Sequence, residues 1–142
     1  EASFRLHIGC RTLADYEAGK TTAPPDVVLR MAEVYDQPDL PADYCASLCP
    51  IGQMFAYRFA KNDMAVAVLG LIKEMADVER LKNNLIAIAA DGQLDKEEMP
   101  EFEEIMREVC HLEKRIGELK LFALRNGIDI ENLMHEQKQK AA

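Results

Sequence analysis

The sequence predicts an all-α fold, and three observations favour it. Ala, Leu, Glu, Met and Lys are abundant among the 142 residues, aromatic residues make up only 6%, and Trp is absent. This mixture favours helices over strands. Hydrophobic residues account for 49% of the chain and charged residues for 30%, as in folded globular proteins. In two long stretches of the second half, apolar residues also recur at helical spacing.

The net charge of -8 limits the kinds of molecule that the protein can bind by charge alone. It argues against a chain that coats nucleic acid or an anionic membrane by bulk electrostatics, so any contact with nucleic acid must be local. The sequence contains no signal peptide and no apolar run long enough to span a bilayer. Its four cysteines form no dense disulfide framework, and we therefore expect a protein of the reducing cytoplasm with no membrane partner.

The chain divides into three segments at 1–35, 36–53 and 54–142. The middle segment has three acids, no bases and several residues that punctuate a helix rather than propagate it, namely Pro38, Pro41, Pro50 and Gly52. It is predicted to be a Pro-rich linker or docking segment.

The third segment is predicted to form a long antiparallel helical hairpin. Its first helix, about Asp63 to Ala90, has an apolar seam at alternating steps of four and three residues, interrupted once at Lys82; the seam consists of Met64, Val68, Leu71, Met75, Val78, Leu85 and Ala89. The second helix repeats this spacing with Phe102, Ile105, Val109, Leu112, Ile116, Leu119 and Ala123. A turn at Asp91 to Leu94 joins the two, and Asp95 and Glu98 have the spacing of a capping box. We expect a short tail helix at 130–137, capped by Asp129, and a dimer formed through the hairpin.

The stretch from Ala2 to Lys20 carries the most functional information. Ser3 is small enough to let two short helices cross closely, and Leu6, Ile8 and Leu13 point inward to make a small core. A helix from about Cys10 to Ala18 then has an outward face, made by Cys10, Arg11, Ala14, Asp15 and Ala18. After Pro24 and Pro25, a further helix would cover the core with Val28, Leu29, Met31, Ala32 and Tyr35.

Eight residues of this stretch fall in register with a known motif: Ser3, Leu6, Ile8, Thr12, Leu13, Tyr16, Glu17 and Gly19. The stretch resembles the helix-turn-helix of Cro and phage repressors, the xenobiotic-response-element (XRE) family of bacterial and phage transcriptional regulators. The resemblance covers 1–35 and implies a lambda-repressor-like domain whose first helix is missing here, so that we expect roughly 15 to 25 residues before Glu1. His7 stands where the family has Gly and would need a left-handed backbone.

The resemblance makes the helix from Cys10 the recognition helix. Arg11 is then the candidate for a bidentate contact with a guanine, and Asp15 either takes a cytosine amino group or orients Arg11. The loop after Gly19 would donate to phosphate oxygens. The predicted DNA-binding residues are Gly9, Cys10, Arg11, Thr12, Ala14, Asp15, Lys20, Thr21 and Thr22.

Other candidate sites are weaker. Cys45 and Cys49 could begin a zinc site or a redox sensor, but no further cysteine or histidine lies at ligand spacing, so both are expected to be packing groups. The acid-rich run from Asp91 to Glu104 does not fit a calcium loop. No acid, base and nucleophile share a plausible pocket, so we expect neither an enzyme nor a cofactor.

The sequence therefore predicts a homodimeric regulator that binds double-stranded DNA. The alternative is a protein-interaction adaptor, antitoxin-like or sensory, in which the hairpin clasps another protein.

Overall fold

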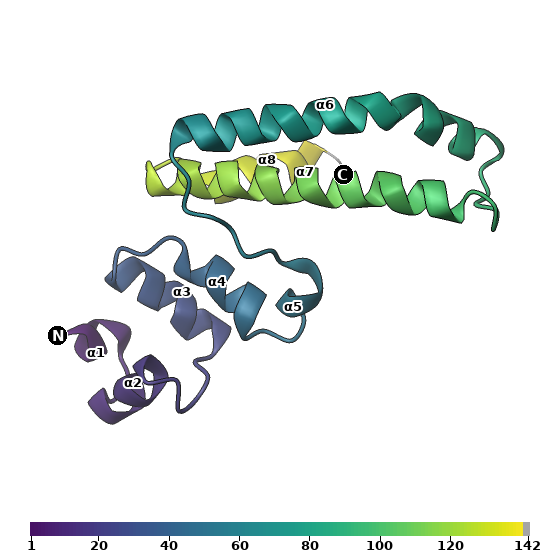
Figure 1. The fold of residues 1–142 in the computed structure, drawn as a ribbon. Coiled ribbons are helices and arrows are strands. Elements are labelled where there is room, and N and C mark those ends of the chain that lie inside the picture. Colours follow the sequence, from purple (N-terminus) through teal and green to yellow (C-terminus); the bar gives the residue numbers. More distant parts are fainter. Residues whose placement is uncertain (141–142) are drawn as a thin grey trace. The chain divides into compact units, whose positions relative to one another are not determined.

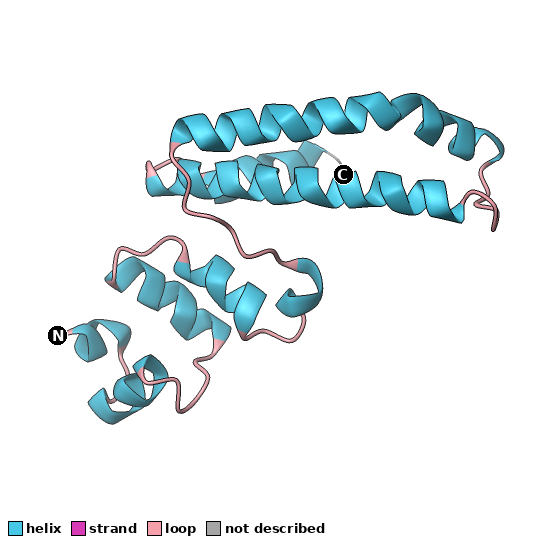
Figure 2. Ribbon diagram, in the orientation of Figure 1, coloured by secondary structure: helices cyan, strands magenta, loops and turns pink. Residues whose placement is uncertain are grey.

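The computed structural model of the protein describes the chain from Glu1 to Lys140, with side chains up to Glu136. These residues form α-helices and a 3-10 turn but no strand, which confirms the predicted all-α fold (Figure 2). No helix in this part of the chain combines the length and the apolar character needed to cross a bilayer. The chain divides into two compact units, Glu1–Phe59 and Ala60–Ala142.

The first unit contains five helices, α1 (Ala2–Leu6), α2 (Cys10–Glu17), α3 (Pro25–Val34), α4 (Leu40–Ser47) and α5 (Gly52–Phe55) (Figure 1). Its core consists of Leu6, Leu13, Val27 and Met31, with Ile8 and Tyr16 packed against it. This is the small core expected from the inward positions of α1 and α2. Leu29 was predicted to cover that core, but it is exposed, and Val27 takes the inward position instead.

The segment 36–53 is not an irregular linker. It forms α4 and α5, because Pro41 falls in the first turn of α4, where a helix needs no backbone donor. Gly52 begins α5 where that helix meets α4, and a Cβ atom on Gly52 would lie 2.2 Å from the carbonyl oxygen of Cys45. Pro41 therefore lies at a helix start, and the compact first unit runs to Phe59 and includes 36–53.

The second unit is a long antiparallel hairpin of α6 (Met64–Ile88) and α7 (Met99–Arg125), followed by α8 (Ile130–Lys140) (Figure 1). The Asp63 carboxylate accepts a hydrogen bond from Val66 N and caps α6. A 3-10 turn, Ala89–Asp91, ends at Gly92 with φ 74°. Glu98 accepts from Asp95 N, which is half of the predicted capping box.

The tail helix is longer than expected and ends at Lys140 rather than at 137. Asp129 accepts a hydrogen bond from Asn132 N, which confirms its predicted capping role.

The seam between α6 and α7 differs in part from the prediction. On α7, Ile105 is buried and Phe102, Val109 and Leu112 are half-buried, as expected, but Ile116 is exposed. On α6 the predicted Met64 and Met75 are more than half exposed, and the buried residues are Ala67, Glu74 and Ile88. The inward face of α6 is therefore rotated from the predicted one and places a carboxylate, Glu74, inside the hairpin.

Candidate nucleic-acid interface

The turn between α1 and α2 depends on His7. His7 has φ 54° and ψ 40°, which confirms the left-handed backbone expected at this position. Its N–H donates to Phe4 O, and the next residue, Ile8, donates to Ser3 O, so two carbonyls near the end of α1 are satisfied. Ser3 Oγ lies 3.1 Å from Cys10 Sγ, which brings the start of α2 against α1.

Helix α2 has one face in the core and one in solvent. Leu13 is buried and Tyr16 half-buried on the inner side. Gly9 is the N-cap, with φ -64°. Of the nine predicted contact residues all are exposed except the half-buried Asp15; the exposed ones are Gly9, Cys10, Arg11, Thr12, Ala14, Lys20, Thr21 and Thr22. The structure thus brings them to the accessible side of α2 and the loop after it.

The charges on this surface divide into free and paired groups. Arg5 on α1 and Arg11 in the first turn of α2 are exposed, and neither forms an ion pair with a described residue. Asp15, in contrast, pairs with Lys20, whose Nζ lies 3.5 Å from Asp15 Oδ1. Asp15 therefore does not orient Arg11 here, and the guanidinium of Arg11 is available for an external acceptor.

The loop after α2 is held mainly by its backbone. Gly19 has φ 67°, and the N–H groups of Lys20 and Thr21 both donate to Asp15 O. Behind the loop lies a hollow of about 350 Å³, with Tyr16 and Met31 among its lining residues. Because side chains do not fill this hollow, the position of Lys20 and Thr21 depends on the hydrogen bonds from their N–H groups to Asp15 O.

One contact that orients α2 was not predicted. The Tyr35 hydroxyl donates a 2.5 Å hydrogen bond to Glu17 Oε1 and so ties the end of α2 to the end of α3. The sequence did contain a hint of this contact: in the Tyr16-Glu17-x-Gly19 motif, an acidic residue on the exposed side directly follows a core residue.

The four cysteines are free thiols. Cys45 is exposed, and Cys49 Sγ accepts a 3.4 Å hydrogen bond from Gly52 N at the start of α5. Among the described residues, the cluster of three donors suited to a metal ion includes neither of them. The two residues thus contribute to the α4–α5 corner, and the candidate metal donors lie in the hairpin instead.

The comparisons add no relative: no family model matches the chain, and neither the curated proteins nor the solved structures contain a match. The geometry of the first unit offers a short helix held from behind by an apolar core, with a free arginine at its exposed N-terminal end. Such a surface can donate hydrogen bonds to an anionic or polar edge.

Proposed function

We propose that the protein is a sequence-specific, DNA-binding transcriptional regulator of the XRE helix-turn-helix type that acts as a dimer. The observation that carries this proposal is Arg11, which is exposed in the first turn of α2 and forms no ion pair with any residue that the structure describes. N-terminal residues of a recognition helix reach the base edges in the major groove, and arginine recognises guanine O6 and N7 with two hydrogen bonds.

The surroundings of α2 support this role. Arg5, on the neighbouring α1, adds a second exposed and unpaired cation. Lys20, Thr21 and Thr22 follow α2 in an exposed loop, where side chains and N–H groups suit phosphate oxygens. The first unit has eight acidic and five basic residues, a net charge of -3, so its contact with DNA must be local to the surface around α2.

The hairpin is proposed to form the dimer. Met64, Leu69, Ile72 and Met75, here called the open face of α6, are each more than half exposed, although the opposite side of α6 packs on α7. Residues 64–72 of α6 are apolar throughout, and a helix segment that is apolar all round is usually buried, so the open face is suited to a partner. A second hairpin placed there would make a four-helix bundle and let two α2 helices read half-sites about 34 Å apart.

Selection of bound sequences from a random DNA pool tests DNA recognition. We expect enrichment of one pseudo-palindromic sequence. On it, Arg11→Ala should cost about 1 to 3 kcal/mol and relax one base position, whereas Lys20→Ala should weaken all sequences alike. Arg30→Ala is the matched control, because Arg30 on α3 is an exposed arginine already paired with Asp26. Footprints unchanged by both Arg11→Ala and Lys20→Ala would contradict the proposal.

Sedimentation of the purified chain tests the dimer. We expect a dimer that Ile72→Glu dissociates, because a charge in an apolar interface is left unpaired. Leu133→Glu introduces the same charge at an exposed apolar residue of α8, the helix that contacts α7, and should leave the dimer intact.

A second candidate is a protein-interaction adaptor, and the open face of α6 is the observation that favours it. In that case the open face binds a different protein, and the thiols of Cys45 and Cys49 offer a place for metal or redox sensing. A monomer in sedimentation that selects no DNA sequence would favour the adaptor over the regulator.

A further inference from the structure

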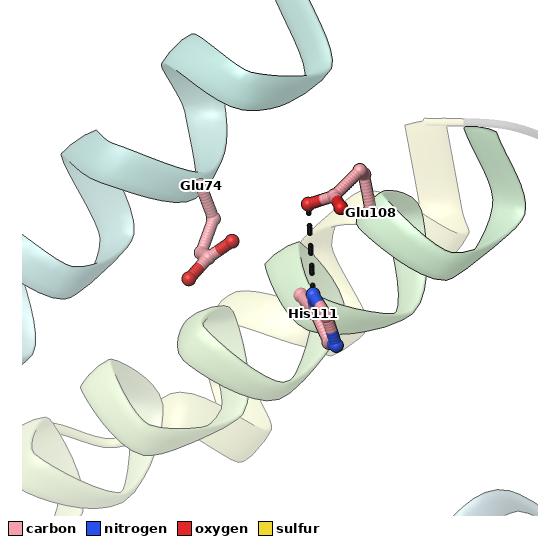
Figure 3. Close-up of side chains that lie close together, drawn as sticks. All are labelled: Glu74, Glu108 and His111. Atoms are coloured by element: carbon pink, nitrogen blue, oxygen red, sulfur yellow. Dashed lines mark ion pairs between the residues drawn. The ribbon is translucent and has the colours of Figure 1, made fainter. Parts of the chain in front are cut away.

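Three side chains with metal-binding atoms meet in the middle of the hairpin. Glu74 comes from α6, and Glu108 and His111 come from one turn of α7 (Figure 3). Each offers one ligand atom, and these atoms all lie within 4.8 Å of one another. His111 Nδ1 is 3.5 Å from Glu108 Oε2. A Glu-x-x-His turn facing a Glu on another helix is an arrangement with which helical bundles hold metal ions.

The Glu74 carboxylate is only half satisfied. Its Oε1 lies 3.3 Å from Lys73 Nζ and 3.9 Å from Arg115 Nε. The Glu74 side chain is only 8% exposed, and its Oε2 is buried without a hydrogen-bond partner. Figure 3 shows this carboxylate directed to the side where Glu108 and His111 lie. A buried, unpartnered charged oxygen is costly, and a cation beside it would remove that cost.

The site is accessible and its neighbouring cations are engaged. A hollow of about 520 Å³, lined in part by Glu108 and His111, opens beside the cluster. Lys73 Nζ lies 2.8 Å from Asp77 Oδ2, and Arg80 also pairs with Asp77. Lys73 also donates to Glu74 Oε1, which leaves Glu74 Oε2 without a partner for an ion that enters on the side of His111, itself exposed.

We propose that Glu74, Glu108 and His111 bind one divalent transition-metal ion per chain. Two carboxylates and one imidazole form a mixed oxygen and nitrogen donor set, which suits Zn²⁺ and its neighbours better than Mg²⁺ or Ca²⁺, ions that take oxygen ligands alone. Water fills the remaining positions. The ion joins α6 to α7 at mid-length and stabilises the hairpin, whether or not the first unit binds DNA.

Titration of the full chain with ZnCl₂ tests the site. We expect one Zn²⁺ per chain and a rise in the hairpin's Tm on the order of 5 °C at saturating metal. His111→Gln and Glu74→Gln should each weaken binding by about tenfold or more, since even residues that only orient metal ligands contribute that much. His135→Gln is the matched control, because His135 Nε2 also lies 3.5 Å from a glutamate of its own helix, Glu131 on α8, but no third donor joins them among the described residues.

X-ray absorption at the zinc edge separates this site from the thiols. We expect nitrogen and oxygen ligands at about 2.0 to 2.2 Å, whereas a thiolate would appear near 2.3 Å. Sulfur in the first shell, or one Zn²⁺ retained at full affinity by His111→Gln, would overturn the proposal. His111 is exposed, so this variant decides the question even if Glu74→Gln fails to fold.

Discussion

The hydroxyl of Tyr35 donates a 2.5 Å hydrogen bond to the Glu17 carboxylate. Glu17 is the last residue of α2 and Tyr35 caps the C-terminus of α3, so this bond connects the ends of two helices that share the core of the first unit. Burial, followed by the hydrogen bond and the charge of Glu17, raises the pKa of Tyr35 to about 12. The orientation of α2 is therefore coupled to the protonation of one phenol.

This coupling predicts a loss of stability at alkaline pH. The unfolded chain has a tyrosine pKa of about 10, so the folded state holds the Tyr35 proton more tightly. Its contribution is complete below pH 10 and is lost as the pH rises from 10 to about 12. Tyr35→Phe should lower the free energy of unfolding by about 1 kcal/mol at pH 7, and this difference from wild type should shrink by pH 11.5. Urea unfolding at both pH values measures it, and an equal difference at both would contradict the coupling.

The left-handed residue in the first turn gives a second prediction. At φ 54°, glycine carries no steric penalty, whereas alanine does. His7→Gly should therefore be more stable than His7→Ala by about 1 kcal/mol. All four tyrosines lie in the first unit and the chain has no Trp, so tyrosine fluorescence during urea unfolding reports this unit. Equal stability of the two variants would mean that the turn does not require this backbone conformation.

The first unit could largely be predicted from the sequence because residues with strong local preferences determine it. Gly19 ends α2 with a positive φ, and the motif placed His7 at a second left-handed position; Asp36, with φ 53°, is a third that no motif marked. The bounds of α2 and most of the core followed from these positions. The segment 36–53 was harder, since a proline both ends a helix and starts one, and only packing decides between the two.

The hairpin shows what apolar spacing leaves undetermined. Steps of three and four fit the predicted seam and also the observed one, because the N-terminal half of α6 is apolar on several sides. Apolar spacing alone does not predict that Glu74 points inward. In the structure, the cationic side chains of Lys73 and Arg115 lie near its carboxylate and lower the cost of burying it. The Glu-x-x-His spacing of Glu108 and His111 can be recognised in the sequence. That Glu74 joins them cannot, because it depends on the register of α6 against α7.

Gly52 gives a third prediction, concerning the α4–α5 corner. A Cβ atom at this position would overlap the backbone of Cys45, which cannot move aside as a flexible side chain can. Gly52→Ala should destabilise the first unit by about 1 to 3 kcal/mol. Gly9→Ala is the control, because its Cβ would find only Thr12 Oγ1, at an ordinary 3.6 Å. If tyrosine fluorescence gives the two variants the same urea midpoint, α5 does not pack on α4 as described.

Glu118 gives the prediction with the largest expected effect. It is 2% exposed on α7 and accepts hydrogen bonds from Ala60 N, Asn62 Nδ2 and Arg115 Nη1, the last at 2.8 Å. Glu118→Ala leaves these donors, including a guanidinium, without their acceptor, so the free energy of unfolding of the hairpin should fall by about 3 to 5 kcal/mol. Glu97→Ala, at an exposed glutamate before α7, should change it by less than about 0.5 kcal/mol.

Far-UV circular dichroism during urea unfolding measures the loss, while tyrosine fluorescence should keep its midpoint because the tyrosines lie in the other unit. A Glu118→Ala hairpin as stable as that of Glu97→Ala would show that this buried carboxylate does not anchor the start of α6.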